Sequence, residues 1–154
     1  MSKLETSESE KNKWRTRIAN EVNLVKAGRR IRGFGPKIVV VKRGEHGVLL
    51  FQGESVFAAP AFPLDHVVDP TGAGDAFAGG FLGYIAGTGD LSFDGVRRAT
   101  LLGSVMGSFA VERFGLDQIS ALTKNDISER FRKFTRISQF SPLKTGEYLP
   151  WRNS

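Results

Sequence analysis

The stretch VVDPTGAGDAFAGGFLGYIAG, residues 67–87, constrains the fold more than any other part of the chain. Two carboxylates, Asp69 and Asp75, bracket a short turn that contains two glycines, and the residues after Asp75 are small or apolar and carry no charge. This pattern predicts a helix that begins at Asp75 and runs to Ile85. The glycines within it predict close packing against neighbouring structure, because glycine otherwise destabilises a helix by roughly 1 kcal/mol relative to alanine.

Strands are predicted before this helix and further helices after it. The continuous run Ile38–Val41 predicts a strand buried on both faces. Val48–Phe51 and Ser55–Ala58 lie on either side of a turn at Gly53, which is typical of a hairpin. Val67 and Val68 resemble the end of another short strand. Helices are predicted over Glu21–Arg32, over Phe93–Arg113 with Gly115 as the stop, and from Asn125 or Asp126 to Phe134. This order of elements indicates one half of an α/β sheet with helices packed on it.

Composition narrows the classes of function. The 154 residues are 40% hydrophobic and 25% charged, as expected for one domain with a core. The absence of cysteine excludes disulfides and thiolate zinc sites, and the two histidines, His46 and His66, are too far apart in sequence to suggest a metal site. We expect a cytoplasmic protein without a membrane partner, since the sequence contains no long apolar segment and no apolar core of a signal peptide.

Positive charge is concentrated near the amino terminus. Residues 1–36 hold nine Lys and Arg against four Glu, out of a net charge of +6 for the chain. Such an arm could bind nucleic acid or another polyanion, which stays an alternative function. The acids are interleaved with the bases, however, and Trp14 is the only aromatic residue before Phe34. A poorly ordered, solvated arm over residues 1–20 is therefore the preferred interpretation, and a nucleic-acid partner is not expected.

The turn between the two carboxylates has the chemistry of an anion site. Gly72 and Gly74 let a ligand approach the backbone, and the first N–H groups of a helix lack acceptors and point outward with the positive end of the helix dipole. A phosphate, and above all the oxyanion of a phosphoryl-transfer transition state, suits such donors. Asp75 would then serve the other reactant, by orienting a hydroxyl and accepting its proton. The alternative is that Asp75 only caps its helix.

The string DPTGAGDAFAGGF closely resembles the carboxy-terminal signature of the PfkB, or ribokinase-like, family of sugar and nucleoside kinases. Two further segments, GPKIVVVKRGEHGVLLF and ATLLGSVMGSFAVERFG, are similar to the strand–loop–strand and the small-residue helix of that family. The resemblance implies the carboxy-terminal half of a ribokinase-like three-layer, Rossmann-like sheet. It also implies ATP-dependent phosphoryl transfer to a hydroxyl of a sugar or nucleoside.

The resemblance assigns roles to residues of this chain. Asp75 would be the catalytic base, and the backbone N–H groups of Gly72, Ala73 and Gly74 would form an anion hole. The ATP-binding residues would be Lys42, Gly44 and Gly47 at the phosphates and ribose, and Ser104 and Gly107 near the adenine. Asp69 and Thr71 match positions that often bind a monovalent cation such as K⁺, and Mg²⁺ would arrive with ATP.

Simpler interpretations of these residues stay open. The loop GEHG is typical of a tight turn between strands, Lys42 stands where many family members have Thr and could be an ordinary strand-end lysine, and glycines such as Gly103 and Gly107 could serve helix packing alone.

The resemblance covers only the carboxy-terminal part of a family member. It runs from about Glu21 to about Phe140, after an apparently unrelated arm over residues 1–20 and before an irregular tail over residues 141–154. We therefore expect a truncated chain that lacks most of the acceptor site and exposes a sheet edge. Its expected partners are ATP, a sugar or nucleoside, and either a second copy or a complementing amino-terminal half. The alternative is a non-catalytic ATP-binding remnant.

Overall fold

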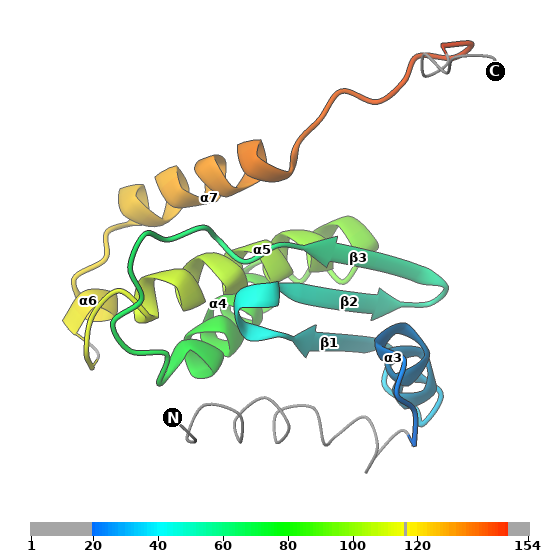
Figure 1. Cartoon of the computed structure of the whole chain (residues 1–154), viewed down its shortest axis with the longest axis horizontal. Helices are drawn as coiled ribbons and strands as arrows, with labels where there is room; N and C mark the ends of the chain where they lie inside the picture. The colour runs from blue at the N-terminus through cyan, green and yellow to red at the C-terminus, as the bar shows by residue number, and fades with distance from the viewer. Residues whose placement is uncertain (1–19, 116, 148–154) are drawn as a thin grey trace, which may run out of the picture.

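The structure, a computed structural model, describes residues 20–115 and 117–147 (Figure 1). Most of the predicted arm over residues 1–20 and the end of the predicted tail therefore lie outside the described residues. The elements, in chain order, are α3 (Leu24–Arg32), β1 (Ile38–Lys42), the 3₁₀ turn η1 (Gly44–His46), β2 (Val48–Gln52), β3 (Ser55–Ala59), α4 (Ala73–Thr88), α5 (Phe93–Ala110), α6 (Asp117–Ser120) and α7 (Lys124–Ser138).

The three strands form an antiparallel sheet in the order β1-β2-β3. Val41 pairs with Leu49 across β1 and β2, and β2 and β3 form the predicted hairpin. Gly53 makes this hairpin turn with a φ of 56°, which favours glycine.

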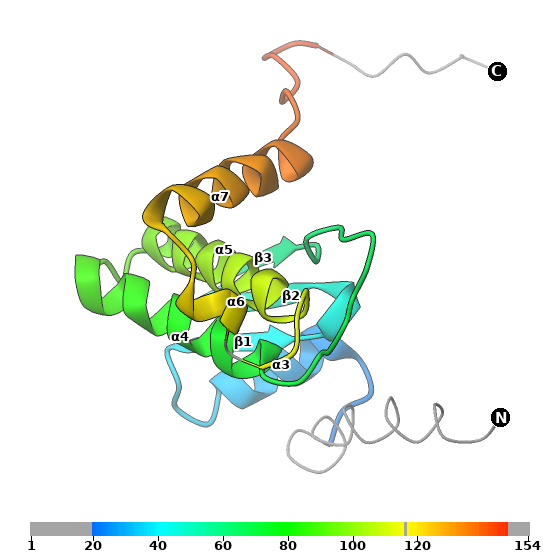
Figure 2. The same cartoon turned by 90° about the vertical axis from the view of Figure 1, so that its left-hand side faces the viewer.

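Helices cover both faces of the sheet, which gives the expected three layers. Alternate strand residues pack on opposite sides. One cluster joins Val41, Leu49 and Phe51 to Leu24 of α3. The other joins strand residues to α4, α5 and α7; its buried members are Val48, Ala59, Phe77, Val105, Phe109 and Phe134. In both views α7 lies next to α5, on the opposite side of the molecule from α3 (Figures 1 and 2).

Burial of the strands differs from the prediction. β2 is the strand buried on both faces, since all residues from Val48 to Phe51 are buried. The strand predicted at Ile38–Val41 is confirmed as β1, but only Val41 is buried and Ile38–Val40 are half-buried, so the predicted burial on both faces was wrong. The reason is position: β2 is central, whereas β1 pairs with β2 along one edge alone among the described residues. A β-branched run does not reveal which strand takes the centre.

Helix boundaries follow capping residues. Ser92 caps α5 by accepting the Gly95 N–H, and Thr123 and Asp126 form a capping box that starts α7 at Lys124. α5 ends at Ala110 instead of Arg113, and the four-residue helix α6 was not predicted. Val67 and Val68 lie in the loop between β3 and α4, so the predicted strand end there was wrong.

Glycines bring α4 and α5 into close contact, as predicted. A Cβ atom on Gly103 would lie 2.8 Å from the carbonyl oxygen of Phe77, and one on Gly80 would lie 3.2 Å from the Cα atom of Gly103. The first distance is too short for a real Cβ and the second is tighter than most Cβ contacts, so these glycines allow the two backbones to approach each other closely. Among the described helices, none combines the length and the hydropathy that a bilayer span requires.

Phe134 tests whether α7 belongs to the core. Its side chain is 1% exposed, so Phe134→Ala should lower the free energy of unfolding by about 3–5 kcal/mol in urea denaturation, because a cavity remains. The matched control is Phe140→Ala, which removes the same side chain at a position 84% exposed and should change stability by less than about 0.5 kcal/mol. Equal effects would contradict the packing of α7.

Candidate active site

The end of α5 anchors the loop that leads into the glycine-rich turn. The backbone N–H groups of Val68 and Asp69 both donate to the carbonyl oxygen of Val111, at 2.8 and 3.3 Å. The Asp69 carboxylate then accepts the backbone N–H of Thr71 at 2.9 Å. These bonds fix the entrance of the turn against the core.

The turn changes into helix at Gly72. Gly72 has a φ of 80°, in the left-handed region that favours glycine, and it is the N-cap of α4. Its carbonyl oxygen accepts the N–H groups of Asp75 and Ala76 at 3.1 and 2.9 Å, which begins the helix.

Two of the three predicted anion-hole donors are available. The N–H of Ala73 donates to the carbonyl oxygen of Pro70 at 3.3 Å, so it is already engaged. Among the described residues, no acceptor is recorded for the N–H groups of Gly72 and Gly74. An anion site needs donors of this kind, and the anion hole stays a prediction.

Lys42 extends from the end of β1 to this same turn. Its ammonium nitrogen donates to the carbonyl oxygen of Gly74 at 2.9 Å and lies 5.7 Å from the centre of the Phe77 ring. The structure thus places a cation beside the N–H groups of residues 72–74. Lys42 thus contacts the start of α4, and its role at the phosphates of ATP stays a prediction.

Asp75 is exposed in the first turn of α4. The cap of this helix is Gly72, and it makes no side-chain capping bond. The alternative that Asp75 only caps its helix was therefore wrong. Within residues 20–115 and 117–147, no hydrogen bond or ion pair is recorded for the Asp75 carboxylate, which leaves both oxygens open to a ligand.

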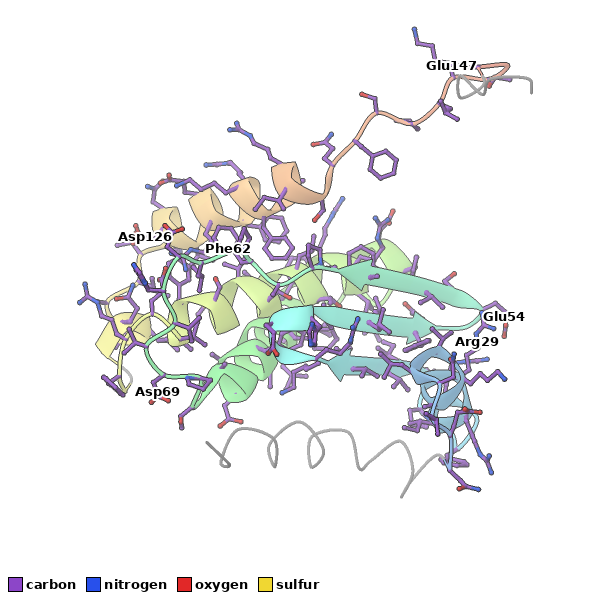
Figure 3. The ribbon with its side chains drawn as sticks, in the orientation of Figure 1. Arg29, Glu54, Phe62, Asp69, Asp126 and Glu147 are labelled. Atoms are coloured by element: carbon purple, nitrogen blue, oxygen red, sulfur yellow. The ribbon has the colours of Figure 1, made fainter. Side chains whose placement is uncertain are left out.

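Asp69 and Thr71 lie at the opposite end of the turn, and Figure 3 shows Asp69 near the start of α4. The Thr71 backbone N–H, followed by the Thr71 hydroxyl, lowers the pKa of the Asp69 carboxyl below its ordinary value of 3.8. Asp69 is therefore ionised at neutral pH. In the described part of the chain, no three His, Asp or Glu side chains gather as a metal site.

The loop after Lys42 is a tight turn, as its sequence suggested. The Arg43 N–H donates to the carbonyl oxygen of Gly47 at 2.8 Å, which closes the turn around η1. Gly47 has a φ of 80°, and a Cβ there would lie 2.8 Å from the Cα of Pro60. Gly44 faces open space, since a Cβ added there would meet no atom within 4 Å. This turn directly follows Lys42 in the chain, and the roles of Gly44 and Gly47 in ATP binding stay predictions.

Helix α5 packs against the glycine-rich turn at the start of α4. A Cβ on Gly107 would lie 3.2 Å from the carbonyl oxygen of Ala73. Gly107 therefore contributes to helix packing, which was the simpler interpretation of this residue. Ser104 lies one turn earlier on α5, and its hydroxyl donates to the carbonyl oxygen of Thr100 at 3.1 Å. The structure brings Gly107 to the turn and leaves Ser104 bonded within its own helix.

Arg130 of α7 holds the end of α5 and was missed by the sequence analysis. Its guanidinium donates to both carboxylate oxygens of Glu112 at 3.0 Å and to the hydroxyl of Ser108 at 3.2 Å, and it lies 3.5 Å from the centre of the Phe109 ring. This contact fixes the chain next to Val111, which anchors the loop before the turn. No sequence motif predicts this contact, because Arg130 is far from Ser108 and Glu112 in the sequence.

A hollow of ≈ 620 Å³ lies beside this clamp, between α7 and the loop after β3. Phe62, Glu112, Arg130 and Lys133 are among its lining residues, and none of the predicted site residues is. Figure 3 shows Phe62 near Asp126, which lies in the first turn of α7, and both are away from Asp69. The hollow is thus separate from the turn at Asp69–Asp75.

Comparison with known proteins identifies the family of this chain. Residues 4–123 match the pfkB family of carbohydrate kinases, which is more than half of the chain. The chain belongs to the pfkB family. The match of this pfkB-family chain begins before the predicted boundary at about Glu21 and ends before Phe140. The family match thus includes most of residues 1–20 as well as the segment from Glu21.

Curated relatives of this pfkB-family chain are nucleoside and sugar kinases. The cytidine kinase of Thermococcus kodakarensis is 55% identical over 64 residues, which are 40% of this chain and 23% of that protein. A nucleoside kinase of Methanothermobacter thermautotrophicus is 32% identical over 113 residues, 73% of this chain and 33% of the relative. The chain thus spans a third or less of the length of these relatives.

Solved structures confirm the ribokinase-like fold. Ribokinase from Thermotoga maritima matches 81% of this chain with a TM-score of 0.65 and 28% identity, and 40% of the ribokinase chain is covered. Aminoimidazole riboside kinase from Salmonella enterica, complexed with aminoimidazole riboside and an ATP analog, has a TM-score of 0.66 and 25% identity over 78% of this chain and 40% of its own.

The lowered pKa of Asp69 predicts a pH dependence of stability. A carboxyl with a depressed folded pKa stabilises the protein above its unfolded pKa, and this contribution is lost as pH falls through the folded pKa. The difference in free energy of unfolding between wild type and Asp69→Asn should be constant between about pH 5 and pH 7. It should shrink below the ordinary value of 3.8. Urea denaturation at each pH measures it, and a difference independent of pH would contradict the Asp69–Thr71 contact.

Proposed function

We propose that this chain carries the ATP-binding and proton-accepting part of a kinase that phosphorylates a hydroxyl of a sugar or nucleoside. The observation that carries this proposal is the exposed, uncapped Asp75 carboxylate next to two N–H groups without acceptors and the Lys42 ammonium. The family of the chain supports the reaction class.

The phosphates of ATP would bind at the first turn of α4. The N–H groups of Gly72 and Gly74 and the ammonium of Lys42 are donors suited to an anion, and the helix dipole adds partial positive charge. The Ala73 N–H would join them after leaving the carbonyl of Pro70. These donors would gain most strength as negative charge develops on the transferring phosphoryl group.

Asp75 would act on the acceptor. Its carboxylate would accept the proton of the acceptor hydroxyl while that oxygen forms a bond to the γ-phosphorus, and the bond from the γ-phosphorus to the bridging oxygen of ADP would break. The position of Asp75 on the helix, at the third residue after the cap, keeps its carboxylate near the phosphate donors without binding to them.

The remaining predicted residues would complete the nucleotide site. Gly44 and Gly47 would lie along the phosphates and ribose, and Ser104 and Gly107 near the adenine. Mg²⁺ bound to the phosphates would neutralise charge on them, and few protein ligands are required for that. Asp69, ionised at neutral pH, and Thr71 would hold a monovalent cation such as K⁺.

We infer that the acceptor is a sugar or nucleoside from the names of the relatives. They include a cytidine kinase and a 2-dehydro-3-deoxygluconokinase. We propose that the part of the kinase fold outside the region of similarity supplies most of the acceptor site, since the matched region is only a fraction of those kinases.

Two substitutions test the proposal in a protein that contains both this chain and the remaining part of the kinase fold, with Mg²⁺-ATP and a panel of sugars and nucleosides. Asp75→Asn should lower the rate of phosphoryl transfer by about 10²–10⁴-fold, because it removes the base, and leave the Kd for ATP measured by calorimetry unchanged. Lys42→Met should weaken ATP binding by about tenfold or more, because a charge-assisted hydrogen bond is lost.

The same measurements distinguish the proposed kinase from the alternative, a protein that binds ATP without catalysis. A non-catalytic ATP-binding protein would bind ATP with the same dependence on Lys42, yet transfer to every acceptor would be absent or equal in wild type and Asp75→Asn. Unchanged ATP binding in Lys42→Met would contradict the phosphate site itself.

A further inference from the structure

The segment that leads from the sheet into the candidate site has few bonds of its own. This segment, the approach loop, runs from Pro60 to Thr71 between β3 and α4 and contains no helix or strand (Figure 1). In the part of the chain that the structure describes, no backbone hydrogen bond is recorded for residues 61–67. A segment without its own hydrogen bonds keeps one conformation only if other elements hold it.

Two contacts hold the approach loop. Near its start, the ring of Phe62 stacks on the ring of Phe134 in α7, with the ring centres 5.8 Å apart. Near its end, the backbone N–H groups of Val68 and Asp69 donate to the carbonyl oxygen of Val111. The first contact attaches the approach loop to α7, and the second attaches it to the end of α5.

Arg130 of α7 touches the residues at both contacts. Its guanidinium carbon lies 5.3 Å from the centre of the Phe62 ring and 3.5 Å from the centre of the Phe109 ring. The same guanidinium donates to both carboxylate oxygens of Glu112 and to the hydroxyl of Ser108. Arg130 therefore joins the start of the approach loop to the end of α5, where the other end of the loop is bonded.

The Arg130–Glu112 pair has the geometry and burial of a contact that fixes a backbone. The two side chains are 17% and 26% exposed, and two parallel N–H···O bonds to one carboxylate define an orientation as well as a distance. The pair of Lys133 and Glu129 on the same helix is 61% and 55% exposed. An exposed pair of that kind is screened by water and contributes little.

We propose that Arg130 is a positioning residue for the candidate active site, because it holds the approach loop against the end of α5 and so sets where α4 begins. Val111, next to the clamp, accepts the N–H of Asp69. The Asp69 carboxylate accepts the N–H of Thr71, the residue before Gly72. This inference rests on the proposed function. It adds that ATP binding depends on α7, a helix that contains none of the predicted site residues.

Hydrogen exchange tests the role of Arg130 in the same protein as the Asp75 and Lys42 variants, one that contains both this chain and the remaining part of the kinase fold. Arg130→Met removes the guanidinium and keeps an unbranched side chain. The Val68 amide should then lose at least about tenfold more protection than the amide of Val105, a buried residue of α5, because the loop opens while the core stays closed. A residue that only stabilised the whole fold would change both amides equally.

The affinity for Mg²⁺-ATP should fall together with the protection of Val68. Arg130→Met should raise the Kd measured by calorimetry by about tenfold, because the donors at Gly72 and Gly74 are no longer held in place before the nucleotide binds. Glu112→Gln is a milder change on the other side of the pair. It should shift both measurements in the same direction, and it takes the place of Arg130→Met if that variant does not fold.

Lys133→Met is the matched control. It makes the same kind of change on the same helix, at the exposed pair, and it should leave the protection of Val68 and the Kd for Mg²⁺-ATP as in wild type. Circular dichroism establishes that each variant is folded.

The outcomes separate this inference from the proposed function. The inference is overturned if Val68 loses no more protection than Val105 in the folded variants of the pair, or if Lys133→Met has the same effect. It is also overturned if wild type binds Mg²⁺-ATP and the variants of the pair bind it with the same Kd. Selective loss of protection at Val68 in a protein whose wild type binds no ATP would overturn the proposed function and leave the hold of Arg130 on the approach loop standing.

Discussion

The close approach of α4 to α5 is the contact on which the candidate site depends. Gly80 and Gly103 remove the side chains that would separate the two helices, and Gly107 lets the start of α4 rest on α5. The end of α5 also supplies the Val111 carbonyl that anchors the loop before the turn. Because α5 contacts the sheet and α7 as well, the position of a few backbone N–H groups is set by the packing of the whole domain.

This packing explains how a carboxylate can lie beside the proposed anion site. The left-handed Gly72 starts the helix, so that the N–H groups of Gly72 and Gly74 are left without acceptors while Asp75 points from the next part of the same turn. Lys42 adds a positive charge from β1 at the carbonyl of Gly74. Donors for a phosphate and an acceptor for a hydroxyl proton thus lie within one helical turn, which is the arrangement that general-base phosphoryl transfer requires.

Much of this site could be predicted from sequence because its signals are local. The turn DPTGAGD and the helix after it need only neighbouring residues, and the capping and hairpin turns are local as well. The features that the sequence analysis missed or predicted wrongly are mostly set by contacts between residues that are distant in the sequence. The central place of β2 over β1 and the clamp of Arg130 on Glu112 arise only once separate elements pack together. The bond from the Ala73 N–H to the Pro70 carbonyl is local, but the residue pattern does not specify it. The roles of individual residues in ATP binding stay predictions.

The amide resonances of Gly72 and Gly74 give the most direct test of the central claim, that the first turn of α4 binds phosphate. In the ¹⁵N-labelled chain, titration with Mg²⁺-ATP should shift both resonances to saturation, whereas adenosine, which lacks phosphates, should leave them in place. Resonances that stay unchanged with ATP, or that shift only around the hollow beside Phe62, would contradict the account.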